Sequence, residues 1–313
     1  MTNAEVIQKA DIALSDLATA GKLNPEQTDR FIRTVLDQPT LLNQVRTVAM
    51  KGPQMKINKI GFGSRILRPA VSATALDPSD RAKPDLGQVQ LDTKEVIAEV
   101  NIPYDVIEDN IEGGNVSGSL QQGAGGLHQT IVDLIAERAA LDLEELAISG
   151  DVANGDDAYL ALQNGYLKLA TANAVNVGGV FDKAAVKAAL GTMPTRYLRN
   201  RSALQHFVSV DNETEIRDQY ASRATALGDQ QLQGMLPVYI YGSRVTPTAL
   251  MPGSNGLFTD PMNLIFGIQR NIMIEYTKDI RARVFIIVLT ARVDFQIEEV
   301  NAVVKYTNIT GSR

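Results

Sequence analysis

Cysteine is absent from this chain of 313 residues, and histidine occurs only twice. Without cysteine, the protein cannot form disulfides, thiolate metal sites or iron–sulfur clusters, and it has no cysteine nucleophile. His128 and His206 accompany no GxSxG pattern or similar nucleophile signature, so we interpret both as structural or surface residues. These absences predict a protein with no catalytic residues, no metal and no cofactor.

Long apolar runs are also missing. Apolar residues make up 44% of the chain and charged residues 21%, but no apolar stretch approaches the roughly 20 residues that span a bilayer. The first residues, MTNAEVIQKADIALSDL, contain acids and lack the basic and apolar regions of a signal peptide. We therefore expect no membrane contact and a protein that is made and used in a cytoplasm.

Positive charge is scarcer than negative charge, with 30 Lys and Arg, 36 Asp and Glu, and a net charge of −6. Non-specific affinity for DNA comes from neutralising phosphates with lysine and arginine, so any contact with nucleic acid should be local or loose. The densest acidic group, Asp105, Glu108, Asp109 and Glu112, has a spacing that fits no calcium loop. We interpret it as a solvated acidic face.

The first fifty residues predict two short amphipathic helices. One begins near Asn3 and ends at Gly21, and the next begins at Asn24-Pro25 and ends before Pro39. Isolated helices of about this length are marginal in water, because most helical stability in proteins comes from packing of the apolar face. We therefore expect both helices to dock on another surface.

Two strand-like segments follow, Lys56–Ile60 and Gln88–Ile102, and a polar stretch with several prolines separates them. They predict a long hairpin-like excursion over residues 64–87. Its distal part, Ala75–Asp85, has too little apolar content to bury itself within its own subunit. An extended arm of this kind usually lies on a neighbouring chain.

A glycine-rich loop, residues 113–126, precedes the strongest predicted helix, Leu127–Leu146, which Ser149-Gly150-Asp151 ends. The loop matches neither the GxxxxGK[ST] nor the GxGxxG phosphate-binding pattern, so we interpret it as a hinge or flexible loop. The remainder alternates helices and strands in an α+β manner. One predicted helix begins at Phe181-Asp182, and another spans Asn212–Arg223. The predicted strands are His206–Val210, Pro237–Tyr241, Leu264–Gly267, Ile272–Tyr276, Val284–Ile297 and Ala302–Tyr306.

Four stretches in this order carry a resemblance to a known family: EVNIPYDVIEDN, AERAALDLEELAISGD, QGMLPVYIYGSRV and DPMNLIFGIQRNIMIEY. With the helical start, the long excursion and the β-rich end, the chain resembles the tailed-bacteriophage major capsid proteins with the Hong Kong 97-type fold, over about residues 50–310. The resemblance implies an N-terminal arm, an extended E-loop hairpin, a P-domain with a long spine helix and a long β-sheet, and a mixed α+β A-domain.

The implied domain boundaries divide the chain into five segments. These are a helical N-terminal arm (1–50), the E-loop with its flanking strands (51–105), the first part of the P-domain with the glycine-rich loop and spine helix (106–165), the A-domain (166–263), and strands that return to the P-domain and close the A-domain (264–313). The arm is shorter than the fused scaffolding segment of some members. This implies either a separate scaffolding protein or assembly without one.

The resemblance implies that the protein is a structural subunit and not an enzyme. Pentamers and hexamers of this chain would form an icosahedral virion shell around double-stranded DNA. Assembly would take place in the cytoplasm of the bacterial host. Its implied partners are further copies, scaffolding, portal and decoration proteins, and loosely held DNA. The candidates for contacts between subunits are the charged residues of the arm, Arg65, Arg68, Arg81, Lys83 and Asp85. Some members crosslink an arm lysine to a neighbour's asparagine, and Lys83 is the candidate for that role.

Two alternatives remain open at this point. An encapsulin, a bacterial compartment with the same fold, encloses an enzyme cargo instead of DNA, although the two-helix arm and long E-loop look more like a phage subunit. A small-molecule enzyme on an α+β scaffold would need a convergent set of polar groups, which the sequence does not display.

Overall fold

The computed structural model describes residues 40–62, 65–67, 77, 79, 81, 83–103, 127–222 and 237–310, without the side chains of 127–133, 270–274, 276 and 278. The two predicted N-terminal helices, the glycine-rich loop, the acidic group at 105–112 and the side chain of His128 lie outside this description. None of the helices in the described ranges is long and apolar enough to cross a membrane.

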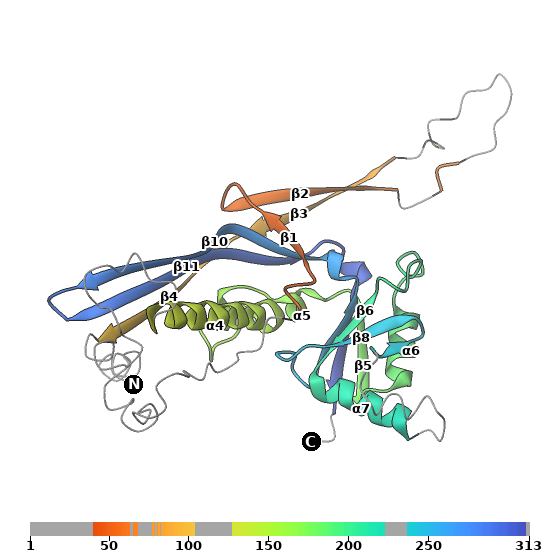
Figure 1. Ribbon diagram of the computed structural model, residues 1–313. Coiled ribbons are helices and arrows are strands. Elements are labelled where there is room, and N and C mark those ends of the chain that lie inside the picture. The colour runs from red at the N-terminus through yellow and green to blue at the C-terminus, as the bar shows by residue number, and fades with distance from the viewer. Residues whose placement is uncertain are drawn as a thin grey trace.

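A four-stranded sheet forms the long part of the molecule, with strand order β1-β10-β11-β4 (Figure 1). The strands β10 and β11 make a long antiparallel hairpin, β1 adds to it in parallel, and β4 pairs antiparallel with β11. Their bounds are β1 Arg46–Ala49, β4 Lys94–Pro103, β10 Leu264–Asp279 and β11 Val284–Ile297.

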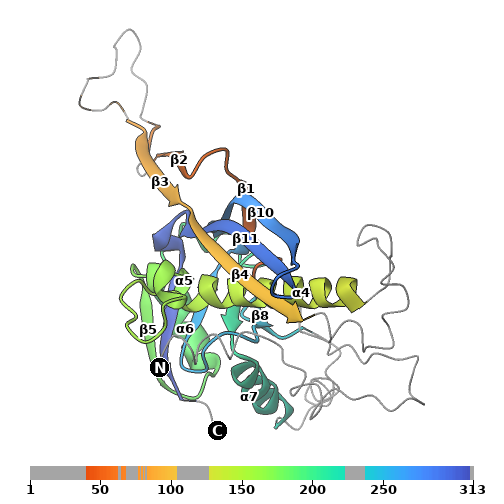
Figure 2. The same cartoon turned by 90° about the vertical axis from the view of Figure 1, so that its left-hand side faces the viewer.

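The helix α4, Leu127–Ser149, runs along this sheet (Figures 1 and 2). Its last turns bury Leu143, Leu146 and Ile148 against Val293 and Phe295 of β11. The predicted helix and its predicted end are thus confirmed. The end requires glycine: a Cβ on Gly150 would lie 2.4 Å from the carbonyl oxygen of Gln163, because the short helix α5 (Tyr166–Leu169) and the segment before it pass close by.

The hairpin of β2 (Gln54–Gly61) and β3 (Asp85–Asp92) projects away from the four-stranded sheet (Figures 1 and 2). The two strands pair antiparallel from Gln54 with Asp92 to Gly61 with Asp85, so the predicted hairpin is confirmed. At Thr93 the chain leaves this hairpin and enters β4. The hairpin root therefore meets the sheet edge at the β3–β4 turn.

A six-stranded sheet forms the other end of the molecule, in the order β5-β12-β9-β6-β8-β7 (Figure 1). Alternate residues bury two different faces: His206 and Phe258 lie in the core with the helices α6 and α7, while Phe207 and Leu257 contribute to the core shared with α4. The bounds are β5 Ala174–Gly179, α6 Lys183–Thr192, β6 Gln205–Val208, α7 Val210–Ala221, β7 Tyr239–Ile240, β8 Ser243–Pro247, β9 Gly256–Thr259 and β12 Val304–Ile309, with 3-10 turns at Leu160–Leu162, Pro261–Asn263 and Val300–Ala302.

Several predicted elements need correction. The segment Gln88–Ile102 is not one strand, because β3 pairs with β2 while β4 pairs with β11. Conversely, the two strands predicted within residues 264–276 are one strand, in which register shifts near Arg270 interrupt the pairing but not the chain direction. Residues 46–49, placed in the helical arm, form β1.

Smaller corrections concern ends and omissions. Val210 begins α7 and does not end β6, because Ser209 caps the helix. The strands β5, β8 and β9 were not among the predicted elements.

Candidate assembly surfaces

The β2–β3 hairpin has two faces of different character. Side chains alternate between them, and Met55, Ile57, Val89 and Leu91 occupy the inner face at the root. There Met55, Ile57 and Leu91 pack against Met50 of the body and Ile265 of β10, in a small apolar cluster. The root of the hairpin is therefore docked on its own subunit by apolar contact.

Lys59 continues the inner face beyond Ile57, where an apolar residue would be expected from the alternation. Its stem lies over Gly87 on the paired strand: a Cβ on Gly87 would be 3.3 Å from Lys59 Cε. Its Nζ donates to the carbonyl oxygen of Glu298 at 2.7 Å and lies 3.3 Å from Oε2 of Glu299. Lys59 thus ties the hairpin to the connection between β11 and β12.

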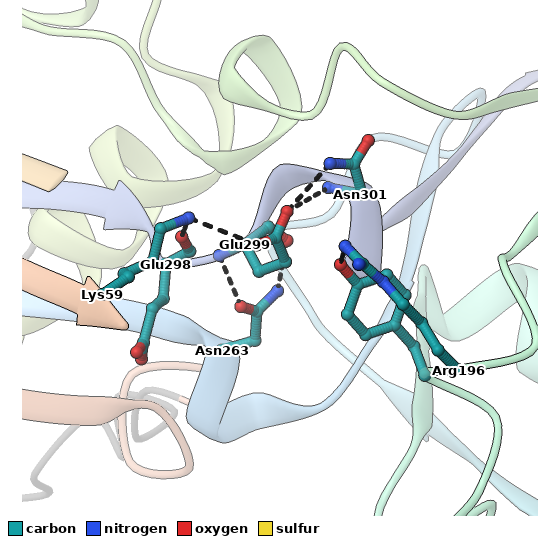
Figure 3. A network of polar contacts seen from close by, with 7 residues as sticks. Lys59, Arg196, Asn263, Glu298, Glu299 and Asn301 are labelled. Atoms are coloured by element: carbon teal, nitrogen blue, oxygen red, sulfur yellow. Dashed lines mark hydrogen bonds and ion pairs between the residues drawn. The ribbon is translucent and has the colours of Figure 1, made fainter. Parts of the chain in front are cut away.

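Glu299 is the centre of a polar network that joins three parts of the chain (Figure 3). Its carboxylate accepts from the side chain of Asn301 at 2.9 Å, and its backbone exchanges two hydrogen bonds with the side chain of Asn263. Burial alone would raise the pKa of Glu299, but the hydrogen bonds from Asn301 and Lys59 outweigh it and lower the pKa. Arg46 in β1 adds an ion pair to Glu298 at 2.7 Å. The network therefore fixes the hairpin root to the junction of the two larger sheets.

The buried carboxylate of Asp294 holds the β3–β4 turn through a hydrogen bond. Oδ2 of Asp294, in β11, accepts from the backbone N–H of Asp92 at 2.7 Å, and Oδ1 accepts from the N–H of Phe295. Burial raises the pKa of Asp294 to about 6, despite these hydrogen bonds. The turn that sends the chain from hairpin to sheet thus rests on a carboxyl group that is costly to ionise.

The outer face of the hairpin changes from polar to apolar towards its tip. Near the root it carries Asn58 and Gln88, which face each other across the strands, but the next outer pair is Ile60 and Leu86. These two side chains are 73% and 76% exposed. Three further exposed apolar residues lie just beyond the hairpin, namely Phe62, Ile66 and Leu67. We call these five residues the apolar tip.

Four of the five charged candidates from the sequence are among the described residues. Arg65, Arg81, Lys83 and Asp85 are exposed, and Asp85 is the first residue of β3, paired with Gly61. Arg68 lies outside the described residues. Their role as contacts between subunits stays a prediction. Sequence reasoning missed the apolar tip itself, because apolar residues interspersed with Arg and Gly form no periodic pattern.

The other residues considered for chemistry from the sequence are His206 and the acidic side chains. His206 is buried, stacks on Phe258 with ring centroids 4.1 Å apart, and bonds through Nδ1 to the hydroxyl of Tyr306 at 2.8 Å. Burial lowers its pKa to about 3, so it is neutral at pH 7. Within the described ranges, no group of three His, Asp or Glu side chains is placed to hold a metal.

Comparison with known proteins identifies the class. No family model matches the sequence. Solved capsid structures have the same fold. One is "Satellite phage P4 procapsid including size determination (Sid) protein", with a TM-score of 0.64 and 13% identity over 98% of this chain and 96% of that chain. Another is "Mycobacterium phage Cain", with a TM-score of 0.60 and 14% identity over 97% of this chain and 100% of that chain. A third is "Capsid of empty GTA particle computed with C5 symmetry", with a TM-score of 0.63 and 16% identity over 96% of this chain and 100% of that chain. The fold is therefore the Hong Kong 97-type fold of phage capsid proteins.

A sequence relative is more specific. The chain is 42% identical over 321 residues to "Putative prophage capsid protein YqbE" of Bacillus subtilis (strain 168), covering 99% of each protein. The chain belongs to this prophage capsid family, so it is a structural protein of a phage capsid and not an enzyme. The predicted family and α+β fold class are confirmed.

Proposed function

We propose that the chain is the major capsid protein of a tailed phage, and that it assembles as pentamers and hexamers into an icosahedral shell around double-stranded DNA. In this proposal, the β2–β3 hairpin is the E-loop, α4 and the four-stranded sheet form the P-domain, and the six-stranded sheet with α6 and α7 forms the A-domain. The boundaries predicted from the sequence, 51–105 for the E-loop and 166–263 for the A-domain, serve as the working division.

The apolar tip is the observation that carries the proposal. A two-stranded ribbon is at best marginally stable by itself, and five exposed apolar side chains on such a ribbon are costly in water unless a partner covers them. Burying each would contribute roughly 1–2 kcal/mol, before the cost of association is subtracted. A shell repeats this contact in every subunit. Many modest contacts then give a stable particle, while each single contact stays reversible enough to correct errors.

The charged residues around the tip fit the rim of such a contact. Exposed ion pairs contribute only about 0–1 kcal/mol each. We therefore assign Arg65, Arg81, Lys83 and Asp85, with Arg68, to orientation of the docked hairpin, and the apolar tip to its affinity.

Further partners follow from the shell. We propose assembly in the cytoplasm of the bacterial host, a portal, decoration proteins, and either a separate scaffolding protein or none. DNA would be held by confinement and counterions, since the chain carries a net charge of −6. Tight binding of DNA by isolated subunits at low salt would contradict this part.

The test is expression of the chain alone, followed by size-exclusion chromatography and negative-stain electron microscopy. We expect rings, tubes or closed shells tens of nanometres across. Double-stranded DNA in particles from infected or induced cells supports the phage function, whereas a protein cargo would indicate an encapsulin-type compartment. A monomer or dimer that stays small at high concentration, with and without candidate scaffolding proteins, would overturn the proposal.

A further inference from the structure

The six-stranded sheet region has an uneven distribution of charge. Residues 183–210 contain two lysines and three arginines and no acid, and residues 237–259 contain one arginine and no acid. This contrasts with the net charge of −6 of the whole chain. These two stretches therefore carry six of the chain's 30 lysines and arginines and none of its acidic residues.

Arg201 and Arg244 come together with two tyrosines at one end of the sheet, and Arg199 lies two residues before Arg201 in the same loop. Arg244 in β8 pairs in register with Tyr239 of β7 and with Gln205, the first residue of β6. A Cβ on Gly242, in the β7–β8 turn, would lie 3.9 Å from Cβ of Arg201. Tyr239 and Tyr241 are exposed apolar rings in the same place. We call Arg199, Arg201, Arg244, Tyr239 and Tyr241 the basic flank.

The basic flank is open for a partner. Its three arginines are exposed, and no carboxylate of the described residues forms an ion pair with them. Guanidinium groups bind carboxylates through paired hydrogen bonds, and arginine and tyrosine are both enriched in protein interfaces. The surface is therefore suited to an anionic protein surface with exposed carboxylates.

The same region of the chain carries such a surface on α7. Asp211, Glu215 and Asp218 lie at positions i, i+4 and i+7, which share one face of a helix. None of the three is buried. We call these three residues the acidic stripe.

The basic flank and the acidic stripe lie at opposite ends of the same strand. β6 begins at Gln205, beside Arg244 and close to Arg201, and ends at Val208, after which Ser209 caps α7. Figure 1 shows α7 at the lower end of the six-stranded sheet, where it also packs beside β8. Among the described residues, no ion pair joins the two surfaces within one copy. They can meet between successive copies in a head-to-tail ring.

We propose that the basic flank of one copy binds the acidic stripe on α7 of the next copy, head to tail. This contact rests on the proposed assembly into pentamers and hexamers, and supplies its specificity around the ring. The basic flank lies on the side of the hairpin root, because Arg196 and Tyr197 of the same loop stand beside the Glu299 network that holds Lys59 (Figure 3). One neighbour would thus receive both the apolar tip and the basic flank.

DNA is the other polyanion that the basic flank could meet. A DNA site would account for the arginines but not for the acidic stripe, which phosphates would repel. Because head-to-tail pairing between copies accounts for both surfaces, it is the occupant that the charge distribution favours.

A charge-swap experiment tests the contact. Arg199→Glu with Arg201→Glu, or Glu215→Lys with Asp218→Lys, should each reduce the yield of particles about tenfold or more, since like charges then face each other. The four substitutions together should restore assembly to near the wild-type level. Lys183→Glu with Lys187→Glu, two exposed lysines of α6 with the same change of charge, serves as the control and should assemble normally. Unchanged melting temperatures of the free subunits exclude misfolding.

The outcomes separate the alternatives. Normal assembly of both reversed variants, or no rescue by the combination, overturns the proposal. If the arginine variant forms normal shells that lose only their DNA, the basic flank is a nucleic-acid site instead.

A second measurement does not depend on complete shells. Because the chain has no cysteine, Arg201→Cys with Asp218→Cys should give a disulfide-linked ladder on oxidation, while neither single variant should. Dimers from one single variant would indicate a symmetric contact and overturn the proposal. If the wild type forms no shells but the ladder appears, the shell proposal fails and the head-to-tail contact stands.

Discussion

The β2–β3 hairpin and the six-stranded sheet use apolar residues in opposite ways. The sheet places Phe258 and Tyr306 fully inside a core between strands and helices, whereas the hairpin leaves Ile60 and Leu86 about three-quarters exposed. The sheet region is thus complete within one subunit. The hairpin packs on its own subunit only at its root, and it leaves the apolar tip exposed.

This difference separates stability of the subunit from stability of the particle. Substitutions in the sheet core should act on folding and reduce assembly only by depleting folded chains. Substitutions in the apolar tip should act on assembly and leave folding unchanged. The predictions below test that separation, beginning with the largest expected effect.

Truncation in the sheet core should cause the largest loss of subunit stability. Phe258→Ala removes a fully buried ring that stacks on His206, and we expect it to cost about 3–5 kcal/mol of unfolding free energy. Chemical denaturation of the free subunit measures it. Ile280→Ala, at a position 77% exposed in the β10–β11 turn, is the control and should change stability by less than about 0.5 kcal/mol.

Charge placed in the apolar tip should abolish assembly without a change in folding. Ile60→Asp with Leu86→Asp removes two apolar contacts of roughly 1–2 kcal/mol each and would bury two carboxylates in the interface. Electron microscopy and sedimentation should show only small species, at an unchanged melting temperature.

The neighbouring outer pair provides the matched control for the tip. Asn58→Asp with Gln88→Asp adds the same two charges on the same face, one pair closer to the root, where the outer face is polar. We expect particles at near wild-type yield. A melting temperature lowered by the Ile60 and Leu86 substitutions would show that the tip packs on its own chain, and the contrast between the two regions would break down.

Acid should stabilise the turn at the hairpin root through Asp294. Its folded pKa, about 6, lies above the ordinary value of 3.8, so its contribution is fully present below about pH 4 and is lost as the pH rises through 6. The shift corresponds to about 2–3 kcal/mol. We expect the wild type to lose stability relative to Asp294→Asn as the pH rises from 4 to 8, because only the wild type ionises in this range.

Melting curves of both proteins from pH 4 to 8 measure the Asp294 effect. Tyr166, Asp92 and Lys94 lie close enough to influence this carboxyl, so the wild type should be compared only with the Asn variant at each pH. A constant difference across the range would mean that Asp294 does not change its charge there.

The sequence predicted the elements whose signals are local. The helix α4 has an apolar stripe and a glycine at its end, α6 has Asp182 as its cap, and Val284–Ile297 is a continuous apolar run that became β11 with the predicted bounds. The family resemblance then supplied the order of the parts. These features did not depend on distant residues.

The error at Gln88–Ile102 and the missed role of Lys59 share a cause, because both depend on partners far away in the sequence. At Thr93 the pairing partner changes from β2 to β11, and the local mark of this change is only the short polar run Asp92–Glu95, which interrupts the apolar alternation. The role of Lys59 depends on Glu298 and Glu299, some 240 residues later. The one local signal was a lysine in the inner-face series after Met55 and Ile57.

Loosening the hairpin root should have the smallest effect and the most local one. Lys59→Met keeps a stem over Gly87 but removes the hydrogen bond to Glu298 and the ion pair to Glu299, which we expect to cost about 1 kcal/mol. Because the network joins the hairpin to the body, amide exchange in residues 54–61 should accelerate while exchange in the six-stranded sheet stays unchanged. Lys56→Met, on the outer face of the same strand, should leave both rates as they are. Equal acceleration in the hairpin and the sheet would show that the network stabilises the whole subunit, and that the hairpin does not move independently of it.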